Sequence, residues 1–421
     1  MKTILFVEHG FEIKEYAFGA AKELGVRVLV ATNIVADNLL EYVRREDIIV
    51  TDVFSSHQLI IDVVAHLSSK GIRIDGVGTF RENAVITTAD LADALSLPGV
   101  GGGPARRSSQ NKLLMRESLR WSDFKSQPKY RFINIFSENA LNDIRNFPKP
   151  CVIKPLFGTA SHGVRKIAEG DNIESIINSL IKVISPESRE IFSLFKGDML
   201  LEEYVAGTLL SIDGFVVDGG VIFVGSTEFI MGNEPNFTQV ASFIPSRLSK
   251  ESQKMCEDTV RDIIARLGFK TSGFHCELRI TDNQVSLIEI ASRLPGGGIH
   301  RTYQKVYGID LVKTMITLWL GGKKEDVKYH APAGVNYHKM VYADQNQIET
   351  LENLDGIPAL GESSLVWDYG RFVQSGDILP WYPMVPQPLY YYAVFSKDAE
   401  SAEKVALDFE SHITYTLKNF E

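Results

Sequence analysis

The first hundred residues alternate between short apolar stretches and segments with helical spacing. Strands are predicted at Ile4–Val7, Val26–Ala31, Ile48–Val50 and Ile74–Val77, with helices over Glu12–Leu24 and Leu59–Leu67. Strands that alternate with helices form a parallel sheet whose faces the helices cover, and ligands bind beyond the carboxyl ends of its strands. Glu82 follows the fourth strand, so we expect it at that edge as a candidate substrate-binding residue.

The pattern of the sequence changes after residue 105. The glycine-rich stretch Pro98–Pro104 is favoured as a linker over a phosphate-binding loop, because the strand and helix that flank such loops are missing. Antiparallel strands mix with separate helices from 106 to about 325. Beyond 326, strands are predicted near Val335–Tyr342 and Leu389–Phe395, and a helix near Ala399–Thr414. We therefore expect three domains, at residues 1–105, 106–325 and 326–421.

Charge and composition exclude some classes of protein. The net charge of −9 over 421 residues argues against nonspecific nucleic-acid binding, which depends on excess Lys and Arg. Cys151, Cys256 and Cys276 have the spacing of neither a metal site nor a disulfide framework, so buried, reduced thiols are expected. No apolar stretch approaches the roughly 18 residues of a membrane span, and the N-terminus lacks a signal-peptide pattern. These features predict a cytoplasmic protein that binds neither nucleic acid nor membrane.

Residues 273–290 predict a hairpin with two opposed glutamates. Apolar and polar residues alternate up to Thr281, and Asp282–Gln284 is expected to form the turn. The apolar face would then pair Ile280 with Ser286, Leu278 with Ile288, and Cys276 with Ile290. On the other face Glu277 lies opposite Glu289, with Cβ atoms about 4.5–5.5 Å apart, where like charges repel. A pair of Mg²⁺ ions would offset that repulsion.

The alternative for these glutamates is simple solvation on an exposed face. The residues that follow favour a site instead. Arg293 comes four residues after Glu289, and Gly296–Gly298 comes next. A cation beside a metal–carboxylate cluster suits an anionic phosphate or carboxylate, and glycines let a backbone approach a ligand closely.

Three further segments have the composition of a nucleotide site. Lys154 ends an apolar strand, and the glycine loop after it contains Gly158, Ser161, His162 and Gly163. Such a loop can cradle phosphate, although a plain hairpin turn is the alternative. Lys112 opens a predicted helix, with a surface lysine as the alternative. The strand that reaches Glu202, Glu203, Tyr204 and Val205 could equally be an ordinary strand end.

In order and approximate spacing, these elements resemble the ATP-grasp superfamily over residues 106–300. The resemblance implies an ATP-grasp fold, α/β and α+β in class, with an N-terminal parallel-sheet domain, a central two-lobed ATP-binding domain and a small C-terminal domain. It implies ATP and a pair of Mg²⁺ ions as cofactors. Lys112, Lys154 and the glycine loop would hold the phosphates, and Glu202–Val205 the adenosine. Glu277 and Glu289 would be the metal ligands.

Within that superfamily the chain is similar to the L-amino-acid ligases of the dipeptide-forming, bacilysin-synthetase type. The similarity lies in Asn111–Arg116, Ser211–Gly214, Phe274–Glu277 and Ile288–Arg293. It implies a carboxylate–amine ligase that forms an amide through an acyl phosphate and releases ADP and phosphate. Catalytic roles would fall to Lys154, Arg293 and Gly297. The implied partners are small-molecule substrates, namely amino acids or a related carboxylate and amine, and a homodimer is one option. The alternatives are another ATP-grasp ligase or carboxylase, and a nucleotide-binding regulatory protein without chemistry.

The chain departs from those ligases at two places. Ala291 stands where many ATP-grasp enzymes have Asn, which would affect the second metal ion. Gln239 and Ser242 stand where the bacilysin-type enzyme has an acidic residue and a histidine, so a different substrate is expected. The remaining substrate-site candidates are Asp213, Glu228, Glu82, Arg293 and Gly296. With Glu234 beside the divergent segment, the acids predict a cationic amino acid at one site, the alternative being ordinary solvated carboxylates.

Overall fold

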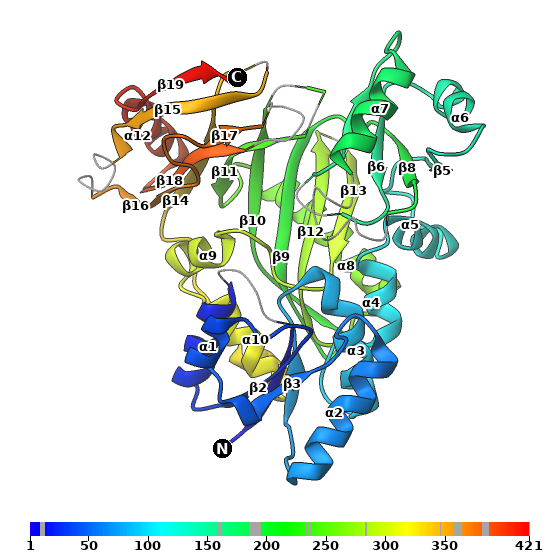
Figure 1. Cartoon of the computed structure of the whole chain (residues 1–421), viewed down its shortest axis with the longest axis vertical. Coiled ribbons are helices and arrows are strands. Elements are labelled where there is room, and N and C mark those ends of the chain that lie inside the picture. The colour runs from blue at the N-terminus through cyan, green and yellow to red at the C-terminus, as the bar shows by residue number, and fades with distance from the viewer. Residues whose placement is uncertain are drawn as a thin grey trace.

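The computed structural model describes residues 1–8, 13–158, 161–184, 195–232, 234–235, 237–282, 284–345, 347–357, 364–380 and 387–420. Figure 1 shows the N-terminal domain at the bottom, a large sheet through the middle, a small lobe at the upper right and the C-terminal elements at the upper left. The expected combination of one parallel sheet with antiparallel sheets is confirmed.

The N-terminal sheet is parallel, as the alternating pattern predicts. Its order is β3-β2-β1-β4, and its strands are β1 (Thr3–Val7), β2 (Arg27–Thr32), β3 (Ile48–Val50) and β4 (Gly76–Gly78). Alternate residues of β1 enter two different cores, with Ile4 and Phe6 on one face and Leu5 and Val7 on the other. Helices α2 (Ser56–Lys70) and α3 (Val85–Ala94) follow β3 and β4 along the chain. Glu82 follows β4, as expected.

The face of the N-terminal sheet that carries Ile4 and Phe6 is covered by α1 (Ile13–Glu23) and α10 (Leu311–Trp319). Helix α10 comes from much later in the chain. Strand β4 begins two residues later and ends one residue later than predicted, and Trp319 of α10 packs against its last residue, Gly78. A Cβ at Gly78 would lie 2.2 Å from the Trp319 ring, so only glycine lets the indole pack against the strand.

The small lobe is a four-stranded antiparallel sheet of order β5-β8-β6-β7. Its strands are β5 (Tyr130–Asn134), β6 (Cys151–Pro155), β7 (Arg165–Ile167) and β8 (Asp198–Glu203). Apolar residues of α6 (Ala140–Asn146) and α7 (Ile173–Val183) pack on one face of this sheet. The helices α4 (Gly102–Ser108) and α5 (Lys112–Trp121) connect the N-terminal domain to the lobe.

The large sheet has eight strands in the order β13-β12-β9-β10-β11-β14-β18-β16. The first five in that order are β13 (Gln284–Ala291), β12 (Ser272–Thr281), β9 (Thr208–Val217), β10 (Gly220–Met231) and β11 (Gln239–Ile244). One face packs on α8 (Lys250–Leu267), and the other on α9 (Ile299–Tyr307) and α10. Within the described residues, no helix combines the length and apolar character that crossing a membrane would need.

The segment after residue 326 extends this sheet. Its strands β14 (Val335–Tyr342), β18 (Pro388–Ser396) and β16 (Val366–Arg371) continue from β11. The helix predicted over Ala399–Thr414 is α12 (Ala399–Glu410), which is shorter because Thr414–Asn419 forms β19. That strand pairs with β15 (Glu349–Asp355), which in turn pairs with β17 (Ile378–Leu379). The three cysteines are buried and free, as expected.

Candidate active site

The predicted glutamate pair is present on the β12–β13 hairpin. Glu277 is the cross-strand partner of Glu289, and Cys276 that of Ile290. Closer to the turn the predicted register is wrong, since Leu278 pairs with Leu287 rather than with Ile288. Ile280 likewise pairs with Val285, and Thr281 with Gln284, which leaves a two-residue connection. Such short connections are favoured in hairpins, and a bulge next to Glu277 absorbs the extra residue without separating the glutamates.

Each of these glutamates has a cation beside it. Lys112 Nζ lies 3.5 Å from Glu289 Oε1, and His275 Nε2 lies 3.4 Å from Glu277 Oε1. Burial alone would raise the pKa of Glu277, but the hydrogen bond and charge of His275, together with the charges of Lys112 and Arg293, hold that pKa below its ordinary value. The repulsion expected between the two carboxylates is therefore already offset inside the chain.

Lys112 is buried, so it is not the surface lysine that was the alternative. It begins α5, whose cap is Asn111, with Oδ1 accepting from the Leu114 amide at 3.0 Å. Besides Glu289, its Nζ donates to the carbonyl oxygen of Gly158 at 3.2 Å. Lys112 thus joins the start of the glycine loop to the hairpin. Ser161, His162 and Gly163 belong to the described part of that loop, while residues 159 and 160 lie outside it.

A buried triad of charges connects the small lobe to the large sheet. Lys154 Nζ lies 2.6 Å from Glu202 Oε2, and Arg116 Nε donates to Glu202 Oε1 at 2.7 Å. Arg116, which the sequence did not single out as functional, also donates to the Ile288 carbonyl at 2.8 Å. Burial alone would raise the pKa of Glu202, but Arg116 and then Lys154 hold it at about 2. Burial lowers the pKa of Lys154, and Glu202 opposes that shift.

Replacing Glu202 with glutamine is expected to lower the free energy of unfolding by about 3–5 kcal/mol, because Arg116 and Lys154 would remain buried without their carboxylate. Urea denaturation at pH 7 measures this. Glu203→Gln is the matched control, since the neighbouring side chain is exposed and its loss should cost less than about 0.5 kcal/mol. Equal stability of the two variants would show that the triad contributes little.

The contribution of Glu202 should also depend on pH. Its pKa falls from the ordinary 4.5 to about 2 on folding, so the stabilisation is complete above pH 4.5 and is lost as the pH falls towards 2. The difference in stability between the wild type and Glu202→Gln should therefore shrink over that window.

The end of β8, where adenosine binding is expected, is occupied by contacts within the chain. Lys166 Nζ lies 4.0 Å from the centre of the Tyr204 ring and 2.6 Å from Glu234 Oε2. Tyr204 donates to Glu234 Oε1 at 3.0 Å. Val205 is half-buried beside them. Glu234, expected beside a cationic substrate, is instead paired with Lys166 and Tyr204.

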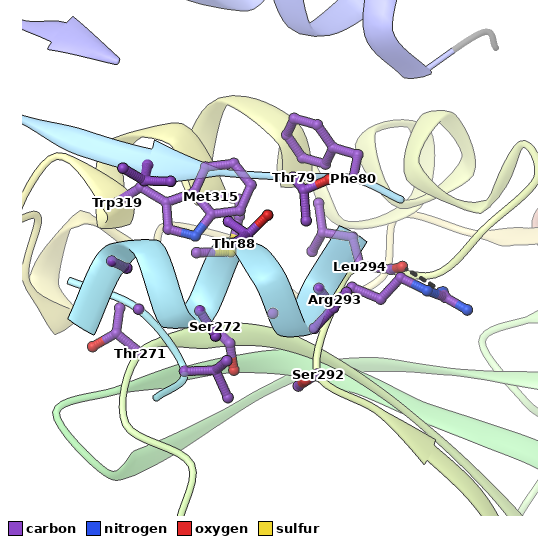
Figure 2. Close-up of a pocket in the computed structure, with 17 residues that line it drawn as sticks. Thr79, Phe80, Thr88, Thr271, Ser272, Ser292, Arg293, Leu294, Met315 and Trp319 are labelled. Atoms are coloured by element: carbon purple, nitrogen blue, oxygen red, sulfur yellow. Dashed lines mark hydrogen bonds between the residues drawn. The ribbon is translucent and has the colours of Figure 1, made fainter. Parts of the chain in front are cut away.

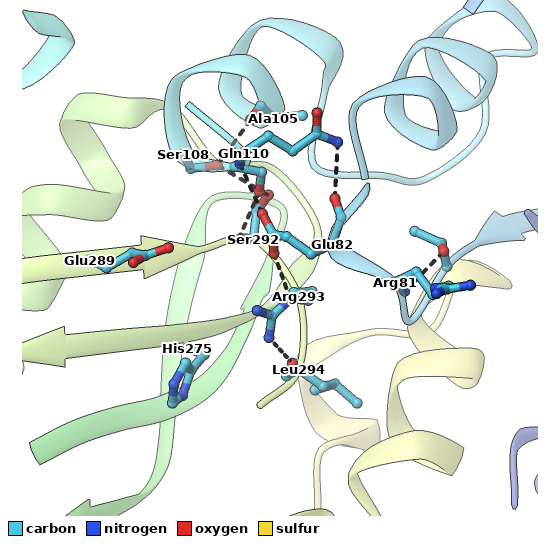
Figure 3. Close-up of polar contacts among 12 residues, drawn as sticks. Arg81, Glu82, Ala105, Ser108, Gln110, His275, Glu289, Ser292, Arg293 and Leu294 are labelled. Carbon is cyan, nitrogen blue, oxygen red and sulfur yellow. Dashed lines mark hydrogen bonds and ion pairs between the residues drawn. The ribbon is translucent and has the colours of Figure 1, made fainter. Parts of the chain in front are cut away.

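Arg293 is held by the N-terminal domain, as Figure 3 shows. Its Nε donates to Glu82 Oε2 at 2.5 Å, and its Nη1 donates to the Leu294 carbonyl at 2.9 Å. The other oxygen of Glu82 accepts from the Gln110 backbone amide at 2.9 Å. The side-chain amide of Gln110 also donates to the Glu82 carbonyl. The sequence placed Glu82 at the correct edge, but its carboxylate receives donors from the chain itself.

The remaining site candidates lie on the large sheet and on the segment between β13 and α9. Asp213 is fully buried and hydrogen-bonded within the chain. Glu228 Oε1 lies 2.6 Å from Arg247 Nη2. Burial alone would raise the pKa of this carboxylate, but the hydrogen bonds from the Arg247 side chain and amide hold it below its ordinary value. Gln239 and Ser242 are half-buried on β11. Gly296 and Gly297 are open, since a Cβ at either position would meet no atom within 4 Å.

A small cavity of about 30 Å³ lies between the N-terminal domain and the segment Ser292–Leu294 (Figure 2). Thr88 and Ser272 line it, and their buried hydroxyls have no hydrogen-bond partner within the described residues. The guanidinium of Arg293 points away from it. Its volume suits a water molecule or a similarly small polar group, and not a whole amino acid.

Two family models match the chain over separate stretches. The ATP-grasp domain model matches residues 147–302, and the ATP-grasp N-terminal domain model matches residues 18–99. The chain belongs to the ATP-grasp family. The first match contains Lys154, Glu202, both hairpin glutamates and Arg293, and the second contains Glu82. ATP-grasp enzymes use ATP with a divalent metal ion.

Among curated proteins, this ATP-grasp chain is similar to an alanine–anticapsin ligase of Bacillus subtilis. The two are 23% identical over 269 residues, which cover 60% of this chain and 56% of the ligase. It is also similar to human (Homo sapiens) carnosine synthase 1, with 23% identity over 348 residues that cover 76% of this chain and 40% of that protein. The chain thus spans about half the length of these relatives.

Among solved structures, the L-amino acid ligase from Bacillus licheniformis superposes with a TM-score of 0.80. The sequence identity is 19%, and the superposition covers 100% of this chain and 99% of the other. At that identity the likeness establishes the ATP-grasp fold alone. The expected fold is therefore confirmed along the whole chain, and the roles of individual site residues stay predictions.

Proposed function

We propose that this chain is an ATP-dependent ligase that joins an amino-acid carboxylate to an amine through an acyl phosphate. The observation that carries the proposal is the opposed pair Glu277 and Glu289, with Lys112 beside it and Arg293 on the following segment. The printed activities of the relatives, alanine–anticapsin ligase and carnosine synthase, support amino acids as the substrate class.

The donor set of the hairpin suits Mg²⁺, which prefers carboxylate oxygens together with substrate phosphates. Within the described residues, no three His, Cys, Asp or Glu side chains form a metal cluster. Glu277 and Glu289 would therefore share the metal with phosphate oxygens. When bound, Mg²⁺ would supply charge neutralisation on the transferring phosphoryl group.

The first step is attack of a substrate carboxylate oxygen on the γ-phosphorus of ATP. The bond from that phosphorus to the bridging oxygen breaks, and ADP leaves. Lys112 and Lys154 would bind phosphate oxygens and offset their charge. Since Lys112 lies beside Glu289 and Gly158, a small shift of its ammonium group would exchange the carboxylate for a phosphate.

The second step is attack of an amine nitrogen on the acyl carbon. The bond from that carbon to the phosphate oxygen breaks, so phosphate leaves with one oxygen of the original carboxylate. Arg293 would stabilise the oxyanion that develops, helped by the open backbone at Gly296 and Gly297.

The expectation of a cationic substrate loses its basis, because Glu228 and Glu234 are both paired within the chain.

Phosphate release from ATP in the presence of pairs of amino acids tests the proposal, with mass spectrometry of the product. We expect at least one pair to give ADP and phosphate in equal amounts, and an amide whose mass is the sum of the pair minus water. Phosphate release only with a non-amino carboxylic acid would support the ligase activity but exclude amino acids as the carboxylate substrate. No release with any carboxylate and amine would overturn the proposal.

A further inference from the structure

Asp213 stands out because it is a charged side chain with no exposed surface at the centre of the large sheet. Burying a carboxylate is costly unless hydrogen bonds replace its water. Its Oδ2 accepts from the hydroxyls of Ser211 at 2.7 Å and Tyr303 at 2.8 Å. Its Oδ1 lies 2.6 Å from His275 Nδ1. With three partners Asp213 is firmly anchored, and it faces the chain's own side chains instead of a ligand.

His275 links this anchored carboxylate to one of the two hairpin glutamates. The cross-strand neighbour of His275 on β9 is Asp213, and that of Glu277 is Ser211. The imidazole therefore has a carboxylate at each ring nitrogen, Asp213 at Nδ1 and Glu277 at Nε2. The Asp213 contact fixes the plane of the ring, and the ring then fixes one oxygen of Glu277.

The same network reaches α9 at its other end. Tyr303 of α9 is fully buried where its hydroxyl meets Asp213, and its ring lies 5.1 Å from that of Tyr307. Tyr307 packs directly over Gly225, where a Cβ would lie 2.5 Å from the ring. Helix α9 starts immediately after Gly298. The hydrogen bond between Tyr303 and Asp213 therefore also attaches the helix that follows the open glycines to the large sheet.

We propose that Asp213 and His275 are positioning residues for the metal ion. His275 holds the Glu277 carboxylate in the orientation that receives the ion, and Asp213, anchored by Ser211 and Tyr303, holds His275. The inference rests on the proposed function, in which Glu277 is a metal ligand. Partners of this kind behind a metal ligand typically contribute 10-fold to 100-fold in metal affinity.

The test measures Mn²⁺ binding by electron paramagnetic resonance, on protein saturated with a nonhydrolysable ATP analogue. His275→Asn retains a donor near Asp213 and loses the contact with Glu277, so the Mn²⁺ dissociation constant should rise at least about tenfold. His275→Gln places an amide nearer Glu277, so the Mn²⁺ dissociation constant should rise less in this variant. Asp213→Asn removes the charge that holds the ring, and its Mn²⁺ dissociation constant should lie between those of the two His275 variants.

His338→Asn is the matched control, because His338 is a half-buried histidine of the same sheet that stacks on Tyr391. Its Mn²⁺ affinity should equal that of the wild type. Wild-type affinity in both His275 variants, with native circular dichroism, would overturn the positioning roles. If the wild-type chain binds no Mn²⁺ together with the analogue, the metal assignment in the proposed function fails instead.

Discussion

Replacing Glu289 with glutamine is expected to reduce turnover by about three orders of magnitude while the fold stays intact. The carboxylate would be a metal ligand, and a metal ion contributes several kcal/mol of charge stabilisation in the transition state. A loss of about 4 kcal/mol corresponds to roughly a thousandfold in rate. The amide has nearly the shape of the carboxylate, and Glu289 is half-buried, so packing should change little. Phosphate release at saturating Mg²⁺ is the measurement.

The matched control for this variant is Glu352→Gln, an exposed glutamate on β15, outside the large sheet. It should keep the wild-type rate. If Glu289→Gln retains most of its activity once Mg²⁺ is saturating, the hairpin glutamates do not share the metal.

Arg293→Lys is expected to lower kcat by about 100-fold to 1,000-fold, the usual cost of losing one donor to a developing oxyanion. Arg293 uses Nε on Glu82 and Nη1 on the Leu294 carbonyl, and within the described residues its Nη2 has no hydrogen bond. A lysine cannot reproduce that planar fork, because its single ammonium group cannot serve both anchors and a ligand. The KM for ATP should change little, since Lys112 and Lys154 are untouched.

Steady-state kinetics of phosphate release separate kcat from KM in this variant. Arg261→Lys is the control, an exposed arginine of α8 on the opposite face of the large sheet, and it should behave as the wild type. A wild-type kcat for Arg293→Lys would remove Arg293 from the chemistry, and a raised KM alone would assign it to binding.

The features that sequence predicted best depend on residues close together in the chain. Glu277 and Glu289 meet because one hairpin carries both, and its period-2 pattern determines which face each side chain takes. The register near the turn was wrong, because the bulge depends on the length of the connection, which the apolar pattern does not specify. The end of α12 was also wrong, because β19 forms by pairing with a strand about sixty residues earlier.

The pairing of charged residues could not be predicted, since it depends on contacts between distant segments. Arg116 and Glu202 are 86 residues apart in the chain, and Glu82 and Arg293 are 211 apart. Helical spacing identifies Arg116 only as a position on α5, and nothing local shows that it is fully buried. For the same reason, the sequence did not show that Glu228 pairs with Arg247 and Glu234 with Lys166.

Transfer of oxygen-18 from the substrate carboxylate to phosphate tests the acyl phosphate directly. An accepted amino acid is labelled with ¹⁸O in its carboxylate and incubated with ATP, Mg²⁺ and its amine partner, and the released phosphate is analysed by mass spectrometry. We expect one ¹⁸O atom in each phosphate, because the carboxylate oxygen that attacks the γ-phosphorus leaves with it. Unlabelled phosphate, with both ¹⁸O atoms recovered outside it, would rule out an acyl phosphate.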